Sequence, residues 1–129
     1  MNNNDKQNPE IQVLIVDDEV GFTHILSKRF SRRGIKPKIA NSGAQAIQLL
    51  RKMDFHCAVL DLKMEDMNGI EVLKIFKKMD PDLPVIMLTG HGSETAAKEG
   101  MSQGAFDYLS KPCELEDLIK KIKQACEQA

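Results

Sequence analysis

Five short apolar runs alternate with longer amphipathic segments along this chain, and this alternation most constrains its fold. The runs begin near residues 12, 36, 57, 84 and 106. Short apolar runs bounded by turn residues are typical of buried strands, and the segments between them repeat apolar residues at helical spacing. Strands that alternate with helices at this pitch favour βαβ crossovers. The sequence therefore predicts an α/β fold with a five-stranded parallel sheet and helices on both faces.

The strands and helices can be placed from the apolar pattern and its turn signals. We expect strands at residues 11–16, 36–40, 57–61, 84–89 and 106–110. We expect helices from residue 22 to near Gly34, and at 42–53, 68–76, 93–103 and 115–126. The second strand is the least apolar and contains Pro37, which indicates an edge position. With that strand at an edge, the natural sheet order is 2-1-3-4-5, as in flavodoxin-like (βα)5 folds.

The first and fourth expected helices differ in their apolar faces. The first repeats large apolar residues at helical spacing: Phe22, Ile25, Leu26 and Phe30. The buried side of the fourth would offer only Ala96, Ala97, Gly100 and Met101. Because small side chains contribute little burial energy, we expect the fourth helix to be the loosest.

Length and composition limit the classes of protein to which the chain can belong. At 129 residues, with 42% apolar and 29% charged residues, it has the profile of one globular domain. We expect that domain at residues 11–129, after a polar, disordered tail at residues 1–10. No apolar run is long enough to span a bilayer and no signal-peptide pattern is present, so we expect a cytoplasmic protein without membrane binding. The net charge of −1 supplies no general field for binding nucleic acid.

Acidic residues lie at the ends of two expected strands. Asp17 and Asp18 follow the first strand, and Asp61 ends the third. In the order 2-1-3-4-5 these strands are neighbours, and their carboxyl ends flank the crevice where open α/β sheets bind ligands. Three close carboxylates destabilise one another unless a cation lies among them, and oxygen ligands without His or Cys suggest Mg²⁺. The backbone carbonyl of Lys63, two residues after Asp61, can reach the same ion.

The ends of the fourth and fifth strands offer a hydroxyl and an ammonium group. Thr89 ends the fourth strand, Gly90 follows it, and Lys111 follows the fifth. Phosphoryl transfer needs an in-line nucleophile and positive charge around the phosphoryl oxygens, and a carboxylate can be the nucleophile. The sequence therefore predicts that Asp61 accepts a phosphoryl group. Lys111 and Thr89 would contact that group, and Gly90 would leave access for a donor or water.

At this point a family resemblance can be stated. From Val13 to about Ala125, the chain resembles the receiver domain of two-component response regulators. The matching segments are residues 14–19, 60–64, 88–90 and 108–112, together with Gly69 eight residues after Asp61. Any one of these segments is a weak signal, but together they are specific.

The resemblance implies a phosphorylation switch rather than a metabolic enzyme. Asp61 would be phosphorylated by a histidine kinase or a phosphotransfer protein, and the chain would catalyse only its own phosphorylation and dephosphorylation. Mg²⁺ would be held by Asp18, Asp61 and the carbonyl of Lys63, with Asp17 acting mainly through water.

The resemblance also implies how the signal leaves the site. Lys111 would pair with the phosphoryl group, and the Lys111-Pro112 peptide bond would be cis. Thr89 and Tyr108 would be the switch pair: the hydroxyl of Thr89 would move toward the phosphoryl group, and the ring of Tyr108 would turn inward behind it. The surface that responds would be formed by residues 93–103, 106–110 and 115–126, and it would meet an output partner or an output domain.

Three further positions can be compared with the pattern of the family. Glu65 stands where the family usually has proline, so the loop after Asp61 is less stiff and more acidic, and together with Asp66 it would modulate metal affinity or partner choice. His91 and Lys63 occupy positions that resemble those that tune the lifetime of the phosphoryl group. For both, simple solvent exposure is the alternative interpretation.

Other functions remain as alternatives to this interpretation. An Mg²⁺-dependent phosphatase with an aspartyl nucleophile usually carries a second acid two residues later, where this chain has Lys63. A flavodoxin-type cofactor binder needs a phosphate-cradling loop after the first strand, and residues 17–19 would repel phosphate. A degenerate receiver that acts as a scaffold would not need all of these acids.

The resemblance leaves the wider protein open. The chain would be either a stand-alone receiver or part of a longer regulator. Residues 89–112 look most like receivers attached to AAA+ transcriptional activators. The cognate kinase and the output partner are not indicated, and a phosphorylation-dependent dimer is left open.

Overall fold

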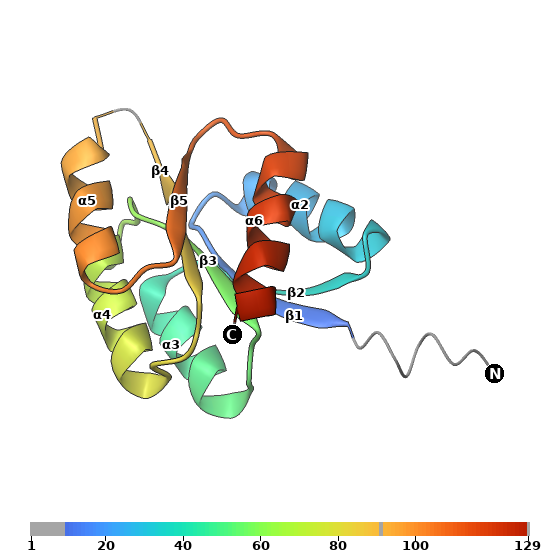
Figure 1. Ribbon diagram of the computed structural model, residues 1–129, viewed down its shortest axis with the longest axis horizontal. Coiled ribbons are helices and arrows are strands. Elements are labelled where there is room, and N and C mark those ends of the chain that lie inside the picture. Colours follow the sequence, from blue (N-terminus) through green and yellow to red (C-terminus); the bar gives the residue numbers. More distant parts are fainter. Residues whose placement is uncertain (1–9, 91, 129) are drawn as a thin grey trace.

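A parallel five-stranded sheet forms the centre of the molecule in the computed structural model, which describes residues 10–90 and 92–128 (Figure 1). The strands are β1 (Ile11–Val16), β2 (Ile35–Ala40), β3 (Cys57–Asp61), β4 (Val85–Thr89) and β5 (Asp107–Ser110). The helices are α2 (Val20–Arg32), α3 (Gly43–Lys52), α4 (Gly69–Met79), α5 (Glu94–Ser102) and α6 (Leu115–Gln128).

The sheet has the order β2-β1-β3-β4-β5, so the predicted fold class and strand order are confirmed. Every neighbouring pair of strands is parallel. The predicted edge position of β2, with Pro37 at its centre, is also confirmed. The expected strand starts at 36, 84 and 106 are each displaced by one residue, because the apolar pattern does not mark where ladder hydrogen bonds begin.

Two apolar layers cover the two faces of the sheet. Helices α2 and α6 lie on one face, and α3, α4 and α5 lie on the other (Figure 1). Alternate strand residues point to opposite faces, so Val13 and Ile15 pack under α2 and α6 while Leu14 and Val16 pack on the other side. Strands buried on both faces explain why the strand segments are nearly continuous apolar runs.

Two residues expected on buried helical faces are exposed. The side chain of Ile25 on α2 is 55% exposed, because the buried stripe of that helix runs through Thr23, Leu26 and Phe30 instead. Met101 on α5 is 40% exposed, and the buried residues of that helix are Ala97 and Gly100. Helical spacing predicts an apolar face, but it does not decide which residues of that face contact the sheet.

Local sequence explains where the helices begin. The hydroxyl of Ser42 accepts a hydrogen bond from the backbone N–H of Gln45 at 3.1 Å, which caps α3. Asn68 caps α4 in the same way by accepting from the N–H of Ile70 at 2.8 Å. The first helix ends before Gly34, whose φ of 76° only glycine adopts readily.

Strand register brings the predicted site residues to one edge. Val16 pairs with Leu60, so Asp17, just beyond the end of β1, lies level with Asp61, the last residue of β3. Across the sheet, Thr89 pairs with Ser110, which places Lys111 immediately past the same edge.

Two predictions fall on residues outside the described part of the chain. Nine residues of the tail expected at 1–10 lie outside it, as does His91. Among residues 10–90 and 92–128, no helix combines the length and the apolar character that crossing a membrane requires.

Candidate functional site

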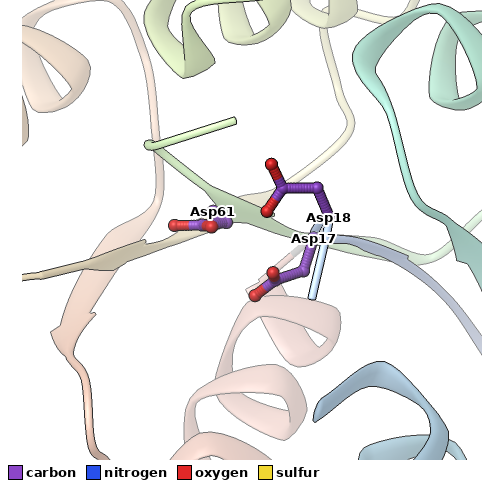
Figure 2. A group of neighbouring side chains, drawn as sticks. All are labelled: Asp17, Asp18 and Asp61. Atoms are coloured by element: carbon purple, nitrogen blue, oxygen red, sulfur yellow. The ribbon is translucent and has the colours of Figure 1, made fainter. Parts of the chain in front are cut away.

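Three carboxylates meet at the carboxyl ends of β1 and β3. Asp17, Asp18 and Asp61 each offer an oxygen atom, and these oxygens lie within 4.8 Å of one another. Figure 2 shows Asp17 and Asp18 at the end of one strand with Asp61 facing them from the next. Asp17 is fully buried and Asp61 is 5% exposed, so water screens little of the repulsion between them. The predicted convergence of these three acids is present.

A backbone N–H group holds each of these carboxylates. Oδ1 of Asp17 accepts from the N–H of Glu19 at 2.9 Å, and Oδ1 of Asp61 accepts from the N–H of Lys63 at 3.2 Å. Oδ2 of Asp18 accepts from the N–H of Glu65 at 3.0 Å. Hydrogen bonds to carboxylates are stronger than those between neutral groups, so the loops after β1 and β3 fix the acids in place.

The ammonium group of Lys111 lies among the acids. Its Nζ is 2.7 Å from Oδ2 of Asp17, 3.0 Å from Oε1 of Glu19 and 3.8 Å from Oδ2 of Asp61. The same Nζ lies 4.6 Å from the centre of the Phe22 ring, a cation–π geometry. Burial alone would lower the pKa of Lys111, but its hydrogen bonds to Asp17 and Glu19 outweigh burial and raise it. The peptide bond between Lys111 and Pro112 is cis, as the family resemblance predicted.

Asp61 has an unusual acidity in this arrangement. Burial, which is the larger cause, and the nearby charge of Asp17 raise the pKa of its carboxyl group from 3.8 to about 6. Lys111 and the N–H of Lys63 act against this change. A carboxyl group with a strongly shifted pKa beside a charged cluster is a candidate for function.

The donor set of the acidic cluster fits a magnesium ion. The three clustered residues provide only carboxylate oxygens, and within the described part of the chain no His or Cys belongs to this cluster. Lys111 carries one positive charge against three carboxylates, so the cluster retains negative charge that a divalent cation would neutralise. Mg²⁺ prefers such hard oxygen ligands and keeps several waters. Asp18 also lines an open pocket with residues 62–68, which leaves space for those waters.

The predicted switch residues lie on the other side of Asp61. Thr89 is 3% exposed, and its hydroxyl donates a long hydrogen bond of 3.4 Å to the carbonyl of Leu109. Tyr108 is 44% exposed. Gly90 is partly exposed, and a Cβ atom added there would meet no atom within 4 Å.

Gly69 allows the backbone after Asp61 to fold tightly. A Cβ atom added at Gly69 would lie 2.5 Å from Cα of Leu62 and 2.9 Å from the carbonyl oxygen of Asp61. The N–H of Gly69 donates to the carbonyl of Leu62 at 3.2 Å. Because the obstacles are backbone atoms that cannot turn aside, only glycine fits here, which explains the glycine eight residues after Asp61.

Lys63 and Glu65, predicted as modulating residues, both have exposed side chains. Their backbone N–H groups contact Asp61 and Asp18, while no contact of either side chain with the acids is observed among the described residues. His91, the third predicted modulator, lies outside the described part of the chain.

Three residues that contact the site region were not assigned to it from the sequence. Glu19 stands at the N-cap position of α2, but its side chain makes no cap bond and binds Lys111 instead. Phe22 was expected only as a core residue. Asn41 donates from Nδ2 to the carbonyl of Asp17 at 2.8 Å. Asp66, which was predicted together with Glu65, accepts from the N–H groups at the start of α3. For Asn41 the sequence did offer a signal, since it directly follows a strand at the site edge.

The fold and the site together define an open, flavodoxin-like α/β domain with an acidic pocket at the point where the strand order reverses. The sequence matches the family described as "Response regulator receiver domain" over residues 13–123. The chain therefore belongs to the response regulator receiver domain family.

Curated relatives and solved structures agree with this assignment. A putative response regulator NtrX-like protein of Rickettsia bellii is 35% identical over 119 residues, which cover 91% of this chain and 25% of that protein. The transcriptional regulatory protein ZraR of Escherichia coli K12 is 35% identical over 89% of this chain and 26% of its own length. This chain thus spans about a quarter of these relatives.

Two solved receiver domains have closely similar folds. The receiver domain of NtrX from Brucella abortus has a TM-score of 0.86 at 28% identity, covering 91% of this chain and 99% of that one. A CheY-like receiver domain protein from Methanospirillum hungatei has a TM-score of 0.88 at 28% identity, covering 92% and 95%. Membership of this family favours the receiver interpretation over the phosphatase and flavodoxin-type alternatives.

Proposed function

We propose that this chain is a phosphoacceptor that takes a phosphoryl group on Asp61 from a phosphohistidine of a histidine kinase or phosphotransfer protein. The observation that carries the proposal is the meeting of three carboxylates and one ammonium group at a single sheet edge. Asp17, Asp18 and Asp61 offer oxygens within 4.8 Å of one another, and Lys111 Nζ lies 3.8 Å from Asp61.

Asp61 is the nucleophile in this proposal. One of its carboxylate oxygens attacks phosphorus, the P–N bond to the donor imidazole breaks, and the electron pair of that bond returns to the ring nitrogen. The attack needs the ionised carboxylate, and a pKa of about 6 leaves Asp61 mostly ionised at neutral pH. The raised pKa also makes this carboxylate a stronger base than an ordinary aspartate.

Mg²⁺ would be held by Asp18, Asp61 and the backbone carbonyl of Lys63, with Asp17 acting mainly through water. When bound, the ion neutralises charge on the carboxylates and on the phosphoryl oxygens. The ammonium of Lys111 is already directed into the cluster by Asp17 and Glu19, and from there it can turn to a phosphoryl oxygen. The open side of Gly90 gives a donor or a water molecule access to the same point.

The switch in this proposal starts at Thr89. Its hydroxyl makes only a 3.4 Å hydrogen bond to Leu109, so exchanging that bond for one to a phosphoryl oxygen costs little. Tyr108 is exposed in this structure and would turn inward behind Thr89. The movement would bias the surface of α5, β5 and α6, which meets an output partner or domain.

The remaining features of the proposal concern the wider protein. The receiver would span residues 11–129 after a tail at 1–10, in the cytoplasm. Exposed Lys63, together with His91, would tune the lifetime of the phosphoryl group, and Glu65 would modulate metal affinity or partner choice. The chain matches about a quarter of the length of curated transcriptional regulators, which supports a place in a longer regulator. Phosphorylation-dependent dimer formation would be one way for it to signal.

Phosphorylation by acetyl phosphate tests the proposal without the unknown kinase. Wild-type protein and Asp61→Asn are incubated with acetyl phosphate, with Mg²⁺ or with EDTA, and intact masses are measured. We expect one added phosphoryl group only in the wild type and only with Mg²⁺. Equal labelling of Asp61→Asn would show a different acceptor and overturn the assignment of Asp61.

A further inference from the structure

The loop between β3 and α4 is attached to the N-terminus of α3, away from the acidic cluster itself. The carboxylate of Asp66 accepts hydrogen bonds from the backbone N–H groups of Gly43 at 3.0 Å and Ala44 at 3.2 Å. These are the first two residues of α3, whose N–H groups have no partner within the helix. The same bonds lower the pKa of Asp66, so the carboxylate is charged when it binds.

A second contact brings the loop and α3 close together. A Cβ atom added at Gly43 would lie 2.8 Å from Sδ and 3.1 Å from Cβ of Met67. Gly43 is buried under this methionine, which is the next residue after Asp66. The two contacts fix residues 66 and 67 against the start of α3.

The residue before Asp66 contacts the acidic cluster. The backbone N–H of Glu65 donates to Oδ2 of Asp18 at 3.0 Å. With that bond in place, Asp18 still offers an oxygen within 4.8 Å of those of Asp17 and Asp61. A carboxylate has roughly four acceptor positions, so one N–H bond leaves room for a cation. A proline at position 65 would carry no N–H and could not make this bond.

We infer that residues 65 and 66 form a latch that positions Asp18 for the metal ion: Asp66 anchors the loop on α3, and the Glu65 N–H holds the Asp18 carboxylate in the ligand cluster. The inference rests on the proposed Mg²⁺ site. Hydrogen bonds that orient ligating groups affect metal affinity about 10- to 100-fold when they are lost. Glu65 and Asp66 are therefore positioning residues, which do not touch the metal or the phosphoryl group.

The anchor is tested with two substitutions at the same helix end. Asp66→Ala and Ser42→Ala each remove a side chain that accepts N–H groups of α3, so both should lower the melting temperature. Only Asp66→Ala frees the loop. We expect Mg²⁺ binding, measured by isothermal titration calorimetry, to weaken about tenfold in Asp66→Ala and to stay within about twofold of wild type in Ser42→Ala.

A conservative variant separates the latch from the charge of Asp66. Asp66→Asn loses the negative charge and one of the two acceptor oxygens, but it keeps an oxygen that can accept from the N–H of Gly43. Its Mg²⁺ affinity should therefore lie between those of the wild type and Asp66→Ala. Equal weakening in the two variants would mean that the retained hydrogen bond does not hold the loop, and the anchor would be wrong.

The hydrogen bond from the Glu65 N–H to Asp18 is tested by comparing two substitutions that differ in whether they keep the N–H. Glu65→Pro removes the N–H and the side chain, while Glu65→Ala removes the side chain alone. We expect Glu65→Pro to bind Mg²⁺ about tenfold more weakly than Glu65→Ala. In ¹H–¹⁵N spectra, the amide proton of Glu65 should also lie further upfield in Asp18→Ala than in the wild type, because it loses a charged acceptor.

The outcomes distinguish this inference from the proposed function. If the wild type binds Mg²⁺ and none of these variants binds it more weakly than its control, the latch is wrong and the metal site stands. If the wild type shows no Mg²⁺ binding at all, the proposed metal site is wrong and the latch falls with it.

Discussion

The two sides of the site differ in how firmly they are held. On the acidic side, Asp17, Asp18 and Asp61 each accept a backbone N–H bond of 2.9–3.2 Å. On the other side, the hydroxyl of Thr89 has one bond of 3.4 Å, and Tyr108 is 44% exposed.

The helices beside the two sides differ in the same way. Helices α3 and α4 both begin with a side-chain cap, whereas Ser93 makes no cap bond at the start of α5. The buried residues of α4 include Ile70, Leu73 and Phe76, and those of α5 are only Ala97 and Gly100.

This difference matches what each side must do. Holding three negative charges together requires a scaffold that does not relax, because relaxation would separate the ligands. A switch requires a region with two arrangements of similar free energy, which is easier where few apolar contacts are lost. The firm side therefore suits binding, and the loose side suits a conformational response.

The largest effect is expected from an added methyl group on the firm side. Gly69→Ala would place Cβ 2.5 Å from Cα of Leu62, where only backbone movement can relieve the clash. We expect a loss of about 3 kcal/mol or more in the free energy of unfolding, measured by urea denaturation. Gly21→Ala is the matched control near the start of α2, because nothing lies within 4 Å of its added Cβ. It should lose no stability.

The same change on the loose side sharpens this test. Gly100→Ala would place Cβ 2.1 Å from Sδ of Met87, which is the far part of a flexible side chain and can turn aside. We expect a cost of about 1–2 kcal/mol from the repacking. If Gly100→Ala proved as damaging as Gly69→Ala, the firmness of the two sides would not differ as described.

A smaller effect is expected from removing charge on the firm side. Asp61→Asn should stabilise the metal-free protein at pH 7 by about 1–3 kcal/mol, because burial and Asp17 raise the pKa of Asp61 from 3.8 to about 6. A carboxyl group whose pKa is raised in the folded state disfavours folding once it ionises. The cost is absent below about pH 4, grows between pH 4 and 6, and is complete above that range.

Thermal unfolding across this pH range measures that effect. The difference in stability between wild type and Asp61→Asn should vanish near pH 4. Added Mg²⁺ should stabilise the wild type more than the variant at pH 7 and so reduce the difference. If the extra stability of Asp61→Asn over the wild type stayed constant from pH 4 to 7, the charge on Asp61 would not be what destabilises the fold.

The smallest effect is expected in local opening of the unmodified protein. The backbone amides of α5 should exchange with deuterium at least about tenfold faster than those of α4, because α5 buries only small residues. Hydrogen exchange followed by mass spectrometry measures both helices in one experiment. Equal protection of α4 and α5 would remove the physical basis for treating α5 as the mobile element.

Much of the fold and the centre of the site could be predicted because their signals are local. Each strand is a short apolar run, and the strand order followed from the weak second strand with Pro37. Asp17, Asp18 and Asp61 were predicted because a residue that ends a parallel strand must emerge at the same sheet edge as its neighbours.

The tertiary structure alone decided the long-range contacts around these acids. The bond from Lys111 to Glu19, the anchor of Asp66 on Gly43 and the Glu65 N–H on Asp18 join residues far apart in sequence. Their partners depend on how the loops pack after the crossovers are made, and no spacing in the chain encodes that. The sequence determined which charges gather at the sheet edge, because the position of each acid along its strand decides where the carboxylates meet and repel one another. Three-dimensional packing decided how firmly these carboxylates are fixed there, because the contacts that restrain them come from neighbouring loops.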